Sequence, residues 1–176
     1  VRAMFKEFFS IYDKLDILVN NAGISLVRVI QDTTLSDWNK IFAVNTTSAF
    51  LCSRAVADRM ICNGGGCIIN ISSIWGEVGA SCETAYSASK GALIAFTKAL
   101  AKELAPSKVR VNCVSPGVID TQMNSDLTGE EMEQLISQIP SGRIGYPEDV
   151  AKACLYLSEA DYVTGEVLSV GGGFAK

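Results

Sequence analysis

The stretches CIINISSIWG (residues 67–76) and TAYSASKGALIAF (residues 84–96) decide how this chain folds. The first begins as a short apolar run, which indicates a buried β-strand, and ends in two serines before a Gly-containing loop. The second starts a helix that we expect to run from about Thr84 to Ala105, because Pro106 follows. A buried strand joined to a long helix is the repeating unit of a parallel α/β sheet.

The rest of the chain repeats this alternation of short apolar strands and helices. We expect further strands at 16–20, 109–114 and 165–170, and helices at 4–12, 34–63, 128–138 and 147–158. This order predicts a doubly wound parallel sheet with helices on both faces. Ser36 and Asp37 offer N-cap oxygens to the helix at 34–63. Asn45 lies in the middle of that helix, where asparagine is unfavourable, so we expect a kink or a polar role there.

Small and polar residues follow three of the expected strands. They are NNAG (20–23), the two serines that end at Ser73, and the turn at Pro116 and Gly117. The carboxyl ends of parallel strands meet at one edge of a sheet, and ligands bind there in open α/β folds. We therefore expect these three segments to border one site.

Tyr86 and Lys90 lie four positions apart in the helix that begins near Thr84, so their side chains share a face. A free tyrosine has a pKa of about 10, and bringing it near 7 requires about 4 kcal/mol. A positive charge about 4 Å away supplies about that much at an effective dielectric constant near 20. We therefore expect Lys90 to make Tyr86 a proton donor or acceptor at neutral pH. For this pair alone, the simpler alternative is a half-buried tyrosine beside a solvated lysine.

The chain contains no histidine, which excludes Ser-His-Asp triads, histidine zinc sites and histidine general bases. Acid–base chemistry near pH 7 must then come from Tyr, Lys, Cys or a carboxylate, and no metal site is expected. The six cysteines form no CxxC pair and fall mostly in apolar segments, which is typical of reduced, buried thiols in a cytoplasmic protein. Cys82 is the thiol closest in sequence to Tyr86.

The composition describes a single globular domain spanning residues 1–176, with 48% apolar residues. The net charge of −4 and a pI near 4.9 argue against nucleic acid as a partner. No apolar run is long enough to span a membrane, and the first residues carry no secretory signal. We expect a cytoplasmic protein that binds neither nucleic acid nor membrane.

Four motifs in this order resemble the short-chain dehydrogenase/reductase family. They are NNAG (20–23), VNTTSAF (44–50), a serine 13 positions before YSASK (86–90), and SPGVIDTQM (115–123). The resemblance extends from Asp16 to Gly173 and implies a Rossmann-like fold and an oxidoreductase that uses NAD or NADP. The segments SGRIGYPEDVA (141–151) and VTGEVLSVGGG (163–173) are similar to those of 3-oxoacyl-[acyl-carrier-protein] reductases and of sugar or polyol dehydrogenases.

The resemblance also implies roles for individual residues. Tyr86 would give a proton to the substrate carbonyl, Lys90 would lower the pKa of Tyr86 and hold the nicotinamide ribose, and Ser73 would bond the substrate oxygen. Asn45 would hold a water that relays protons to the lysine. The implied catalytic residues are thus Asn45, Ser73, Tyr86 and Lys90. The implied cofactor contacts are Asn20, Ala22, Gly23, Tyr86, Lys90, Pro116, Gly117, Ile119 and Thr121.

One departure from the family pattern is large. Members begin with a strand and a glycine-rich turn that binds the pyrophosphate, and nothing of that kind precedes Asp16. We expect that the first strands and helices are absent from this chain, that it is the C-terminal two-thirds of such a domain, and that alone it binds dinucleotide poorly. The segment that selects NAD or NADP is part of the expected gap.

The resemblance leaves several functions open. A 3-oxoacyl-[acyl-carrier-protein] is the first candidate substrate, and another carbonyl such as a sugar or polyol ketone is the alternative. A non-catalytic dinucleotide-binding regulator would typically lose the tyrosine or the lysine, and both are present here. A purely structural α/β domain with an accidental YxxxK is a further alternative. The resemblance also implies a homodimer or homotetramer through the helices at 36–62 and 84–105, where alanines 85, 88, 92, 95 and 99 permit close approach or packing on the chain's own sheet.

Overall fold

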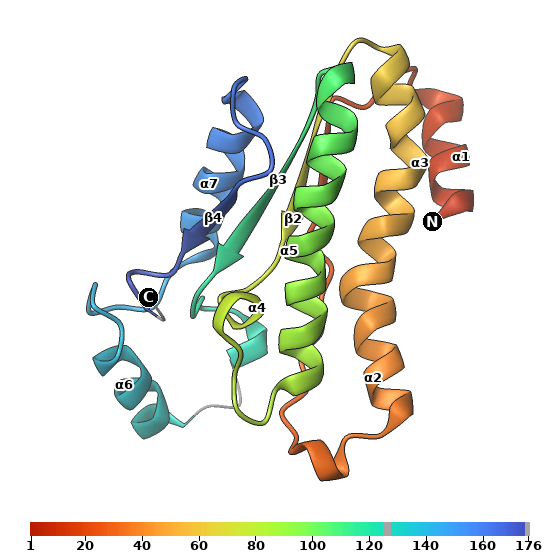
Figure 1. Ribbon diagram of the computed structural model, residues 1–176. Helices are drawn as coiled ribbons and strands as arrows, with labels where there is room; N and C mark the ends of the chain where they lie inside the picture. The colour runs from red at the N-terminus through yellow and green to blue at the C-terminus, as the bar shows by residue number, and fades with distance from the viewer. Residues whose placement is uncertain (125–127, 175–176) are drawn as a thin grey trace.

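The computed structural model describes residues 1–124 and 128–174 and contains one parallel sheet (Figure 1). The sheet has the strand order β1-β2-β3-β4, from Ile17–Asn20, Gly66–Ile71, Val109–Pro116 and Val167–Val170. The longer helices are α1 (Arg2–Ile11), α2 (Leu35–Phe42), α3 (Ser48–Cys62), α5 (Thr84–Leu104), α6 (Gly129–Ser137) and α7 (Pro147–Glu159). Short 3-10 turns occupy Ile30–Asp32, Ala105–Ser107 and Gln122–Asn124. The predicted parallel sheet with flanking helices is confirmed.

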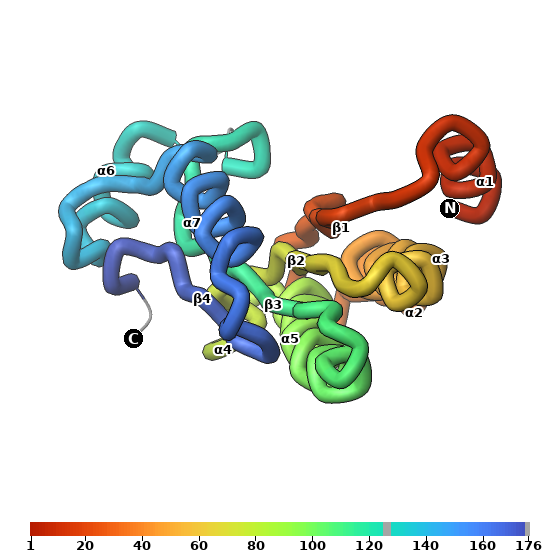
Figure 2. Tube along the Cα trace, turned by 90° about the horizontal axis from the view of Figure 1, so that it is seen from above, coloured from red at the N-terminus to blue at the C-terminus, as the bar shows by residue number. Residues whose placement is uncertain are grey.

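Helices α3 and α5 cover one face of the sheet, as the view along the strands shows (Figure 2). Their core is formed by apolar residues that are almost completely buried, and Phe5 of α1 packs against its edge. The members from the strands and from α3 are Val56, Met60, Ile68, Val109 and Val111. Burial of such large side chains supplies the main favourable free energy of folding.

Helix α7 covers the opposite face and packs on Ile69, Ile71 and Val114 through Ala153 and Leu157. Successive side chains of β2 therefore enter opposite cores, which explains why the strand is a continuous apolar run. The chain passes from β2 to β3 through α5 on one face and from β3 to β4 through α7 on the other, while the strand order advances in one direction. The two crossovers consequently have opposite hands, and only one can be the common right-handed form.

The helix expected at 34–63 is interrupted near its middle. Thr34, rather than Ser36 or Asp37, is the N-cap residue: its hydroxyl accepts from the Asp37 N–H, and the Asp37 carboxylate accepts from the Thr34 N–H. Residues Ala43–Thr47 form a π-helical turn between α2 and α3, with Asn45 at its centre. The expected irregularity at Asn45 is thus present. π-Turns inside helices are frequent at functional sites.

Two further features concern the rim of the fold. The segment expected to be only a loop after Ser73 contains a short helix, α4 (Trp75–Val78). Strand β1 lies at the edge of the sheet, where Ile17 and Val19 are each 44% exposed.

In the part of the chain that the structure describes, no helix is both long and apolar enough to cross a bilayer.

Candidate active site

The four residues with predicted catalytic roles lie together where β2 ends, between α4, α5 and the π-turn. Ser73 follows β2, Tyr86 and Lys90 lie in the first two turns of α5, and Asn45 faces them from the π-turn. All four side chains are buried. Buried polar groups of this kind require specific partners, and these partners define the geometry of the site.

Lys90 is anchored to the sheet. Its Nζ donates to the backbone carbonyl oxygen of Ile71 at 2.8 Å and lies 5.8 Å from the centre of the Tyr86 ring. The loop after β1 also reaches the ammonium, since a Cβ added to Gly23 would lie 3.1 Å from Nζ and 3.5 Å from the Asn45 side-chain oxygen. The backbone at Gly23 therefore approaches Lys90 so closely that an added side chain would crowd the ammonium.

The pKa of Tyr86 differs from the sequence-based expectation. Burial raises the pKa of the phenol above its usual value, the negative charge of Glu83 raises it further, and a hydrogen bond with the Ser73 side chain lowers it. Lys90 does not contribute to this shift, because its ammonium points to Ile71 and lies over the ring face rather than beside the hydroxyl. The expected acidification of Tyr86 by Lys90 is therefore wrong for this arrangement, and the phenol is protonated at neutral pH.

Burial lowers the pKa of Lys90 from 10.5 to about 8, and the neighbouring Cys113 opposes this change. The thiol of Cys113 is itself buried, and burial raises its pKa to about 11. Lys90 is thus mainly an ammonium at pH 7 but loses its proton in the mildly alkaline range. An ammonium has three donor hydrogens, and Ile71 takes one of them.

Asn45 connects the loop after β1 to α5. Its Nδ2 donates to the Ile24 carbonyl oxygen at 2.9 Å and to Ser89 Oγ at 3.0 Å, and its Oδ1 accepts from the Ile24 N–H at 2.8 Å. Ser89 Oγ in turn donates to the carbonyl oxygen of Tyr86 at 2.7 Å. Both amide hydrogens of Asn45 are used, and the π-turn aims the side chain across the gap between the helices. The implied water-relay role stays a prediction.

The Ser73 side chain faces Tyr86, and its oxygen already accepts one hydrogen bond. Its Oγ accepts from the Trp75 N–H at 3.2 Å, and its side chain also forms a hydrogen bond with the Tyr86 phenol. Helix α4 touches α5 directly, since a Cβ on Gly76 would lie 2.7 Å from the Lys90 carbonyl carbon. Ser72 strengthens the same contact by donating to the carbonyl oxygen of Lys90 at 2.9 Å. The Ser73 loop is therefore packed firmly on the helix that carries Tyr86.

The residues with predicted cofactor roles fall into two groups. Gly23 and Lys90 meet as described, with Ala22 exposed beside them, and Pro116 and Gly117 lie at the end of β3 next to Gly171. In contrast, the Asn20 side chain donates to Asn70 Oδ1 at 2.8 Å and to Ser53 Oγ at 3.2 Å, so it connects β1 to β2 and α3. Ile119 is buried against Gly145, and Thr121 is exposed.

Sequence reasoning did not single out three residues that surround the site. Ser89 supports Asn45, Cys113 lies beside Lys90, and Glu83 acts electrostatically on Tyr86. Glu83 is three positions before Tyr86 and lies immediately before α5, so its nearness in sequence was a signal for it. Cys82, which sequence analysis noted, has a left-handed φ of 62°, and its thiol lies 3.8 Å from Ser81 Oγ.

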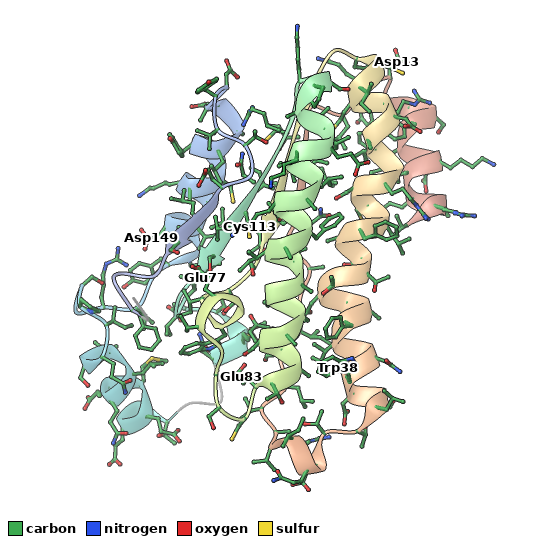
Figure 3. The ribbon with its side chains drawn as sticks, in the orientation of Figure 1. Asp13, Trp38, Glu77, Glu83, Cys113 and Asp149 are labelled. Atoms are coloured by element: carbon green, nitrogen blue, oxygen red, sulfur yellow. The ribbon has the colours of Figure 1, made fainter. Side chains whose placement is uncertain are left out.

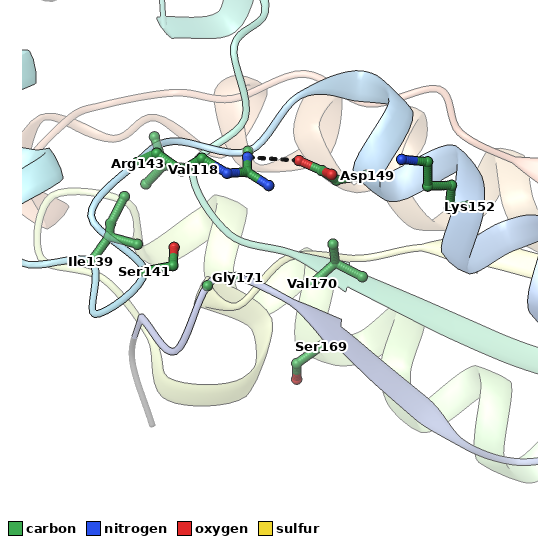
Figure 4. A pocket seen from close by; sticks show the side chains of 11 residues that line it. Val118, Ile139, Ser141, Arg143, Asp149, Lys152, Ser169, Val170 and Gly171 are labelled. Atoms are coloured by element: carbon green, nitrogen blue, oxygen red, sulfur yellow. Dashed lines mark hydrogen bonds and ion pairs between the residues drawn. The ribbon is translucent and has the colours of Figure 1, made fainter.

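A separate cavity of about 310 Å³ lies on the α7 side of the sheet, between the end of β4 and the loop at 139–145 (Figure 4). Its wall includes the ion pair between Arg143 and Asp149, with a distance of 2.8 Å, and the Lys152 side chain. The walls contain none of the four predicted catalytic residues. This cavity is therefore distinct from the site around Tyr86.

The site around Tyr86 fits a nicotinamide dinucleotide. Two donor hydrogens of the Lys90 ammonium remain for a ribose diol, and the side-chain-free backbone at Gly23 lies directly beside them. The backbones at Gly117 and Gly171 also approach each other closely, with 2.7 Å from an added Cβ on Gly117 to the Gly171 Cα. These segments lie at strand ends, where dinucleotides bind in α/β folds.

Comparison with known proteins agrees with this description. A family model described as enoyl-(acyl carrier protein) reductase matches residues 1–175. The 3-oxoacyl-[acyl-carrier-protein] reductase FabG of Aquifex aeolicus is 44% identical over 175 residues, which cover 98% of this chain and 71% of that protein. Cyclopentanol dehydrogenase of Comamonas testosteroni is 46% identical over 166 residues, which cover 92% of this chain and 66% of that protein.

A solved structure shares the fold in detail. The gluconate 5-dehydrogenase of Burkholderia cenocepacia J2315, in complex with NADP and tartrate, superposes with a TM-score of 0.93 at 34% identity. The match covers 98% of this chain and 69% of that one. The chain belongs to the short-chain dehydrogenase/reductase family of NAD(P)-dependent oxidoreductases.

Proposed function

We propose that the protein reduces the ketone of a 3-oxoacyl group, foremost a 3-oxoacyl-[acyl-carrier-protein], to the 3-hydroxyacyl product with NADPH or NADH. The observation that carries this proposal is the buried pair of hydroxyls, Ser73 and Tyr86, beside the Lys90 ammonium. A bound carbonyl oxygen would accept hydrogen bonds from both hydroxyls. The similarity to FabG proteins supports the oxoacyl substrate.

Tyr86 supplies the proton in this reaction. Its phenol is protonated at neutral pH, because burial and Glu83 both raise its pKa, so it is suited to act as the acid. A reduced nicotinamide held by Lys90 and the loop at Gly23 would supply the hydride to the carbonyl carbon and would itself be oxidised. As negative charge develops on the carbonyl oxygen, the Tyr86 O–H transfers its proton there, and the product is a neutral alcohol.

Ser73 stabilises the charges that form. Its oxygen accepts from the Trp75 N–H, and its O–H would donate to the developing oxyanion. After the proton leaves Tyr86, the hydrogen bond with Ser73 stabilises the phenolate. Lys90 would hold the ribose hydroxyls of the cofactor, and Asn45 and Ile71 would hold Lys90 and the loop at Gly23 in place.

A second candidate is a dehydrogenase of sugars, polyols or simple alcohols. The similarity to cyclopentanol dehydrogenase and to the gluconate 5-dehydrogenase fold supports this alternative. A non-catalytic role is disfavoured, because Asn45, Ser73, Tyr86 and Lys90 are all present and lie together. The six cysteines are free thiols, which suits the reducing cytoplasm that we infer as its location.

We also infer that two copies associate through α2, α3 and α5. Ala88, Ala95 and Ala99 of α5 are exposed and therefore do not pack on the chain's own sheet. Phe50 of α3 is 42% exposed and contacts Phe96 of α5 edge-on, with ring centres 6.3 Å apart. These side chains give the helical face a small-residue stripe with an aromatic edge, which allows close approach of a second helix pair.

An assay of the protein expressed from its complete gene tests the reaction. Acetoacetyl-[acyl-carrier-protein], cyclopentanone and 5-ketogluconate are offered with NADPH and with NADH, and cofactor oxidation is followed by absorbance. We expect the highest kcat/KM for the carrier-bound substrate. Turnover of the ketose or the cyclic ketone alone would support the second candidate, and no turnover of any carbonyl would support the non-catalytic role.

A further inference from the structure

We propose that Ser89 is a positioning residue for the reaction. Its hydroxyl, acting through Asn45, would fix the loop after β1 in the place beside Lys90 that a bound cofactor requires. The inference rests on the proposed reduction with a nicotinamide cofactor. It assigns a role to a buried side chain outside the four residues with predicted catalytic roles.

Ser89 lies on α5, the helix that runs beside α2, the π-turn and α3 (Figure 3). The residue is completely buried. Its Oγ donates to the Tyr86 carbonyl oxygen at 2.7 Å and accepts from Asn45 Nδ2 at 3.0 Å. Because a hydroxyl has one hydrogen, the bond to Tyr86 leaves the Ser89 oxygen as an acceptor toward Asn45. The directions of both hydrogen bonds are therefore fixed.

A second hydrogen bond joins the π-turn to the same position of α5. Thr46 Oγ1 donates to the backbone carbonyl oxygen of Ser89 at 2.9 Å. This backbone contact does not need the Ser89 hydroxyl. Truncation of Ser89 to alanine should therefore leave the π-turn attached to α5 and remove only the side-chain contact with Asn45.

The loop after β1 depends on Asn45 for its hydrogen bonds. Ile24 donates its N–H to Asn45 Oδ1 at 2.8 Å, and its carbonyl oxygen accepts from Asn45 Nδ2 at 2.9 Å. Among the described residues, no other hydrogen bonds are found for the segment 21–27. Gly23 precedes Ile24 and is the residue whose backbone approaches the Lys90 ammonium. A shift of Asn45 would therefore move the loop relative to Lys90.

Loss of the Ser89 hydroxyl would leave a buried donor without its acceptor. Asn45 is 1% exposed, and one of its two amide hydrogens is bound by Ser89. An unpaired buried donor costs more free energy than an ordinary hydrogen bond contributes, so the amide would turn toward another acceptor. Such a turn would weaken its bonds with Ile24. A binding site tolerates displacements of only about 0.5 Å, so the cofactor ribose would be held less well.

Hydrogen exchange at the Ile24 amide tests the effect on the loop. The measurement uses the protein expressed from its complete gene, without cofactor. In Ser89→Ala we expect this amide to exchange about tenfold faster than in wild type, because Asn45 Oδ1 is its acceptor. The Ile69 amide of the central strand β2 should change less than about twofold. An unchanged exchange rate at Ile24 would overturn the inference.

Cofactor binding tests the consequence for the reaction. Ser89→Ala should raise the Kd for NADPH, measured by fluorescence, and the KM for NADPH about tenfold each. The kcat at saturating NADPH should fall less than about threefold, because Ser73 and Tyr86 keep their side chains. A lower kcat with unchanged Kd would contradict a role in placing the cofactor loop.

A double variant tests whether Ser89 acts through Asn45. Asn45→Ala alone should raise the Kd for NADPH at least as much as Ser89→Ala does. The combination of both changes should have no larger effect than Asn45→Ala alone, because residues in one hydrogen-bond network are not additive. Effects that multiply in the double variant would show that Ser89 acts independently of Asn45, against the inference.

Thr97→Val is the matched control. Thr97 is another completely buried hydroxyl of α5, and it has the same kinds of partner: it donates to the Leu93 carbonyl oxygen and accepts from Asn70 Nδ2, both at 2.9 Å. Its loss should leave the Kd for NADPH and the Ile24 exchange rate within about twofold of wild type. Equal changes in Thr97→Val and Ser89→Ala would reduce the role of Ser89 to general stability and overturn the inference.

The proposed function can fail separately from this inference. A wild-type protein that reduces no carbonyl would contradict the proposed function. The Ile24 exchange rate and the Kd for NADPH do not depend on turnover, so they still decide whether Ser89 positions the loop.

Discussion

The Nζ of Lys90 donates to the carbonyl oxygen of Ile71 at 2.8 Å, so the ammonium is attached to the end of β2. It lies over the face of the Tyr86 ring, 5.8 Å from its centre. The Lys90 ammonium therefore interacts with the strand end and with the cofactor side of the site. The hydrogen bond with Ser73, in contrast, stabilises the phenolate form of Tyr86. This division between the two side chains leads to separate predictions for each.

Lys90 should make stability depend on pH in the alkaline range. Its pKa is about 8 in the folded protein and 10.5 when exposed, so the unfolded chain binds more protons between these values. The contribution of Lys90 to stability is fully present above pH 10.5 and is lost as pH falls through 8. Between pH 8 and 10, the free energy of unfolding of wild type should rise by about 2 kcal/mol relative to Lys90→Met, measured by urea denaturation. Parallel pH curves would contradict this assignment.

Replacing Tyr86 by Phe removes the proton donor without changing the packing of the ring. We expect kcat to fall by about 10³-fold, within the usual range for loss of a general acid, while NADPH binding measured by fluorescence stays within about twofold. Tyr156→Phe is the control, because Tyr156 is 55% exposed on α7 and distant from the site in sequence and in the fold. Equal rates in wild type and Tyr86→Phe would exclude the proposed mechanism.

Ser73→Ala should affect the oxidation direction in a pH-dependent manner. The hydrogen bond from Ser73 lowers the pKa of Tyr86, so its loss raises that pKa and makes the phenolate less available. We expect the rising limb of the pH–rate profile for alcohol oxidation to move to higher pH, together with a loss in kcat of about 10²-fold. Ser72→Ala, which removes a hydroxyl that donates to the Lys90 carbonyl oxygen and bonds the Cys113 thiol, should leave the limb in place. A limb that stays in place in Ser73→Ala would show that this hydroxyl does not tune the phenol.

Gly23→Ala tests the close approach of the loop to Lys90. The added Cβ would lie 3.1 Å from Nζ, so the lysine or the loop must shift by a few tenths of an ångström. We expect the KM for NADPH to rise about tenfold, because the ammonium no longer has its place beside the loop. Gly129→Ala is the control, since nothing lies within 4 Å of its added Cβ at the start of α6. An unchanged KM in Gly23→Ala would remove this loop from the cofactor site.

Phe50→Glu tests the inferred association of two copies. Phe50 is 42% exposed on α3, so a glutamate at this position would be buried only where a second copy covers it. We expect wild type to sediment as a dimer or tetramer in analytical ultracentrifugation and the variant to dissociate at micromolar concentration. Val27→Glu, at a 73% exposed position outside the helices, is the control. A wild-type monomer would contradict the inference.

The local sequence determined much of the secondary structure and part of the site. The apolar runs at β1, β2 and β3, the long helix after Ser73 and the irregularity at Asn45 were predictable, because strand and helix periodicity and asparagine's poor fit in a helix are properties of adjacent residues. The spacing of Tyr86 and Lys90 also placed them on one helical face.

Tertiary structure decided the features that depend on distant segments. The direction of the Lys90 ammonium is set by the Ile71 carbonyl and the Gly23 loop, and its pKa by burial under the sheet and α4. The opposite hands of the two crossovers depend on which face α7 covers. Spacing along a helix indicates which side chains can meet. The charge and burial of a site residue depend on its neighbours, which only the complete fold brings together.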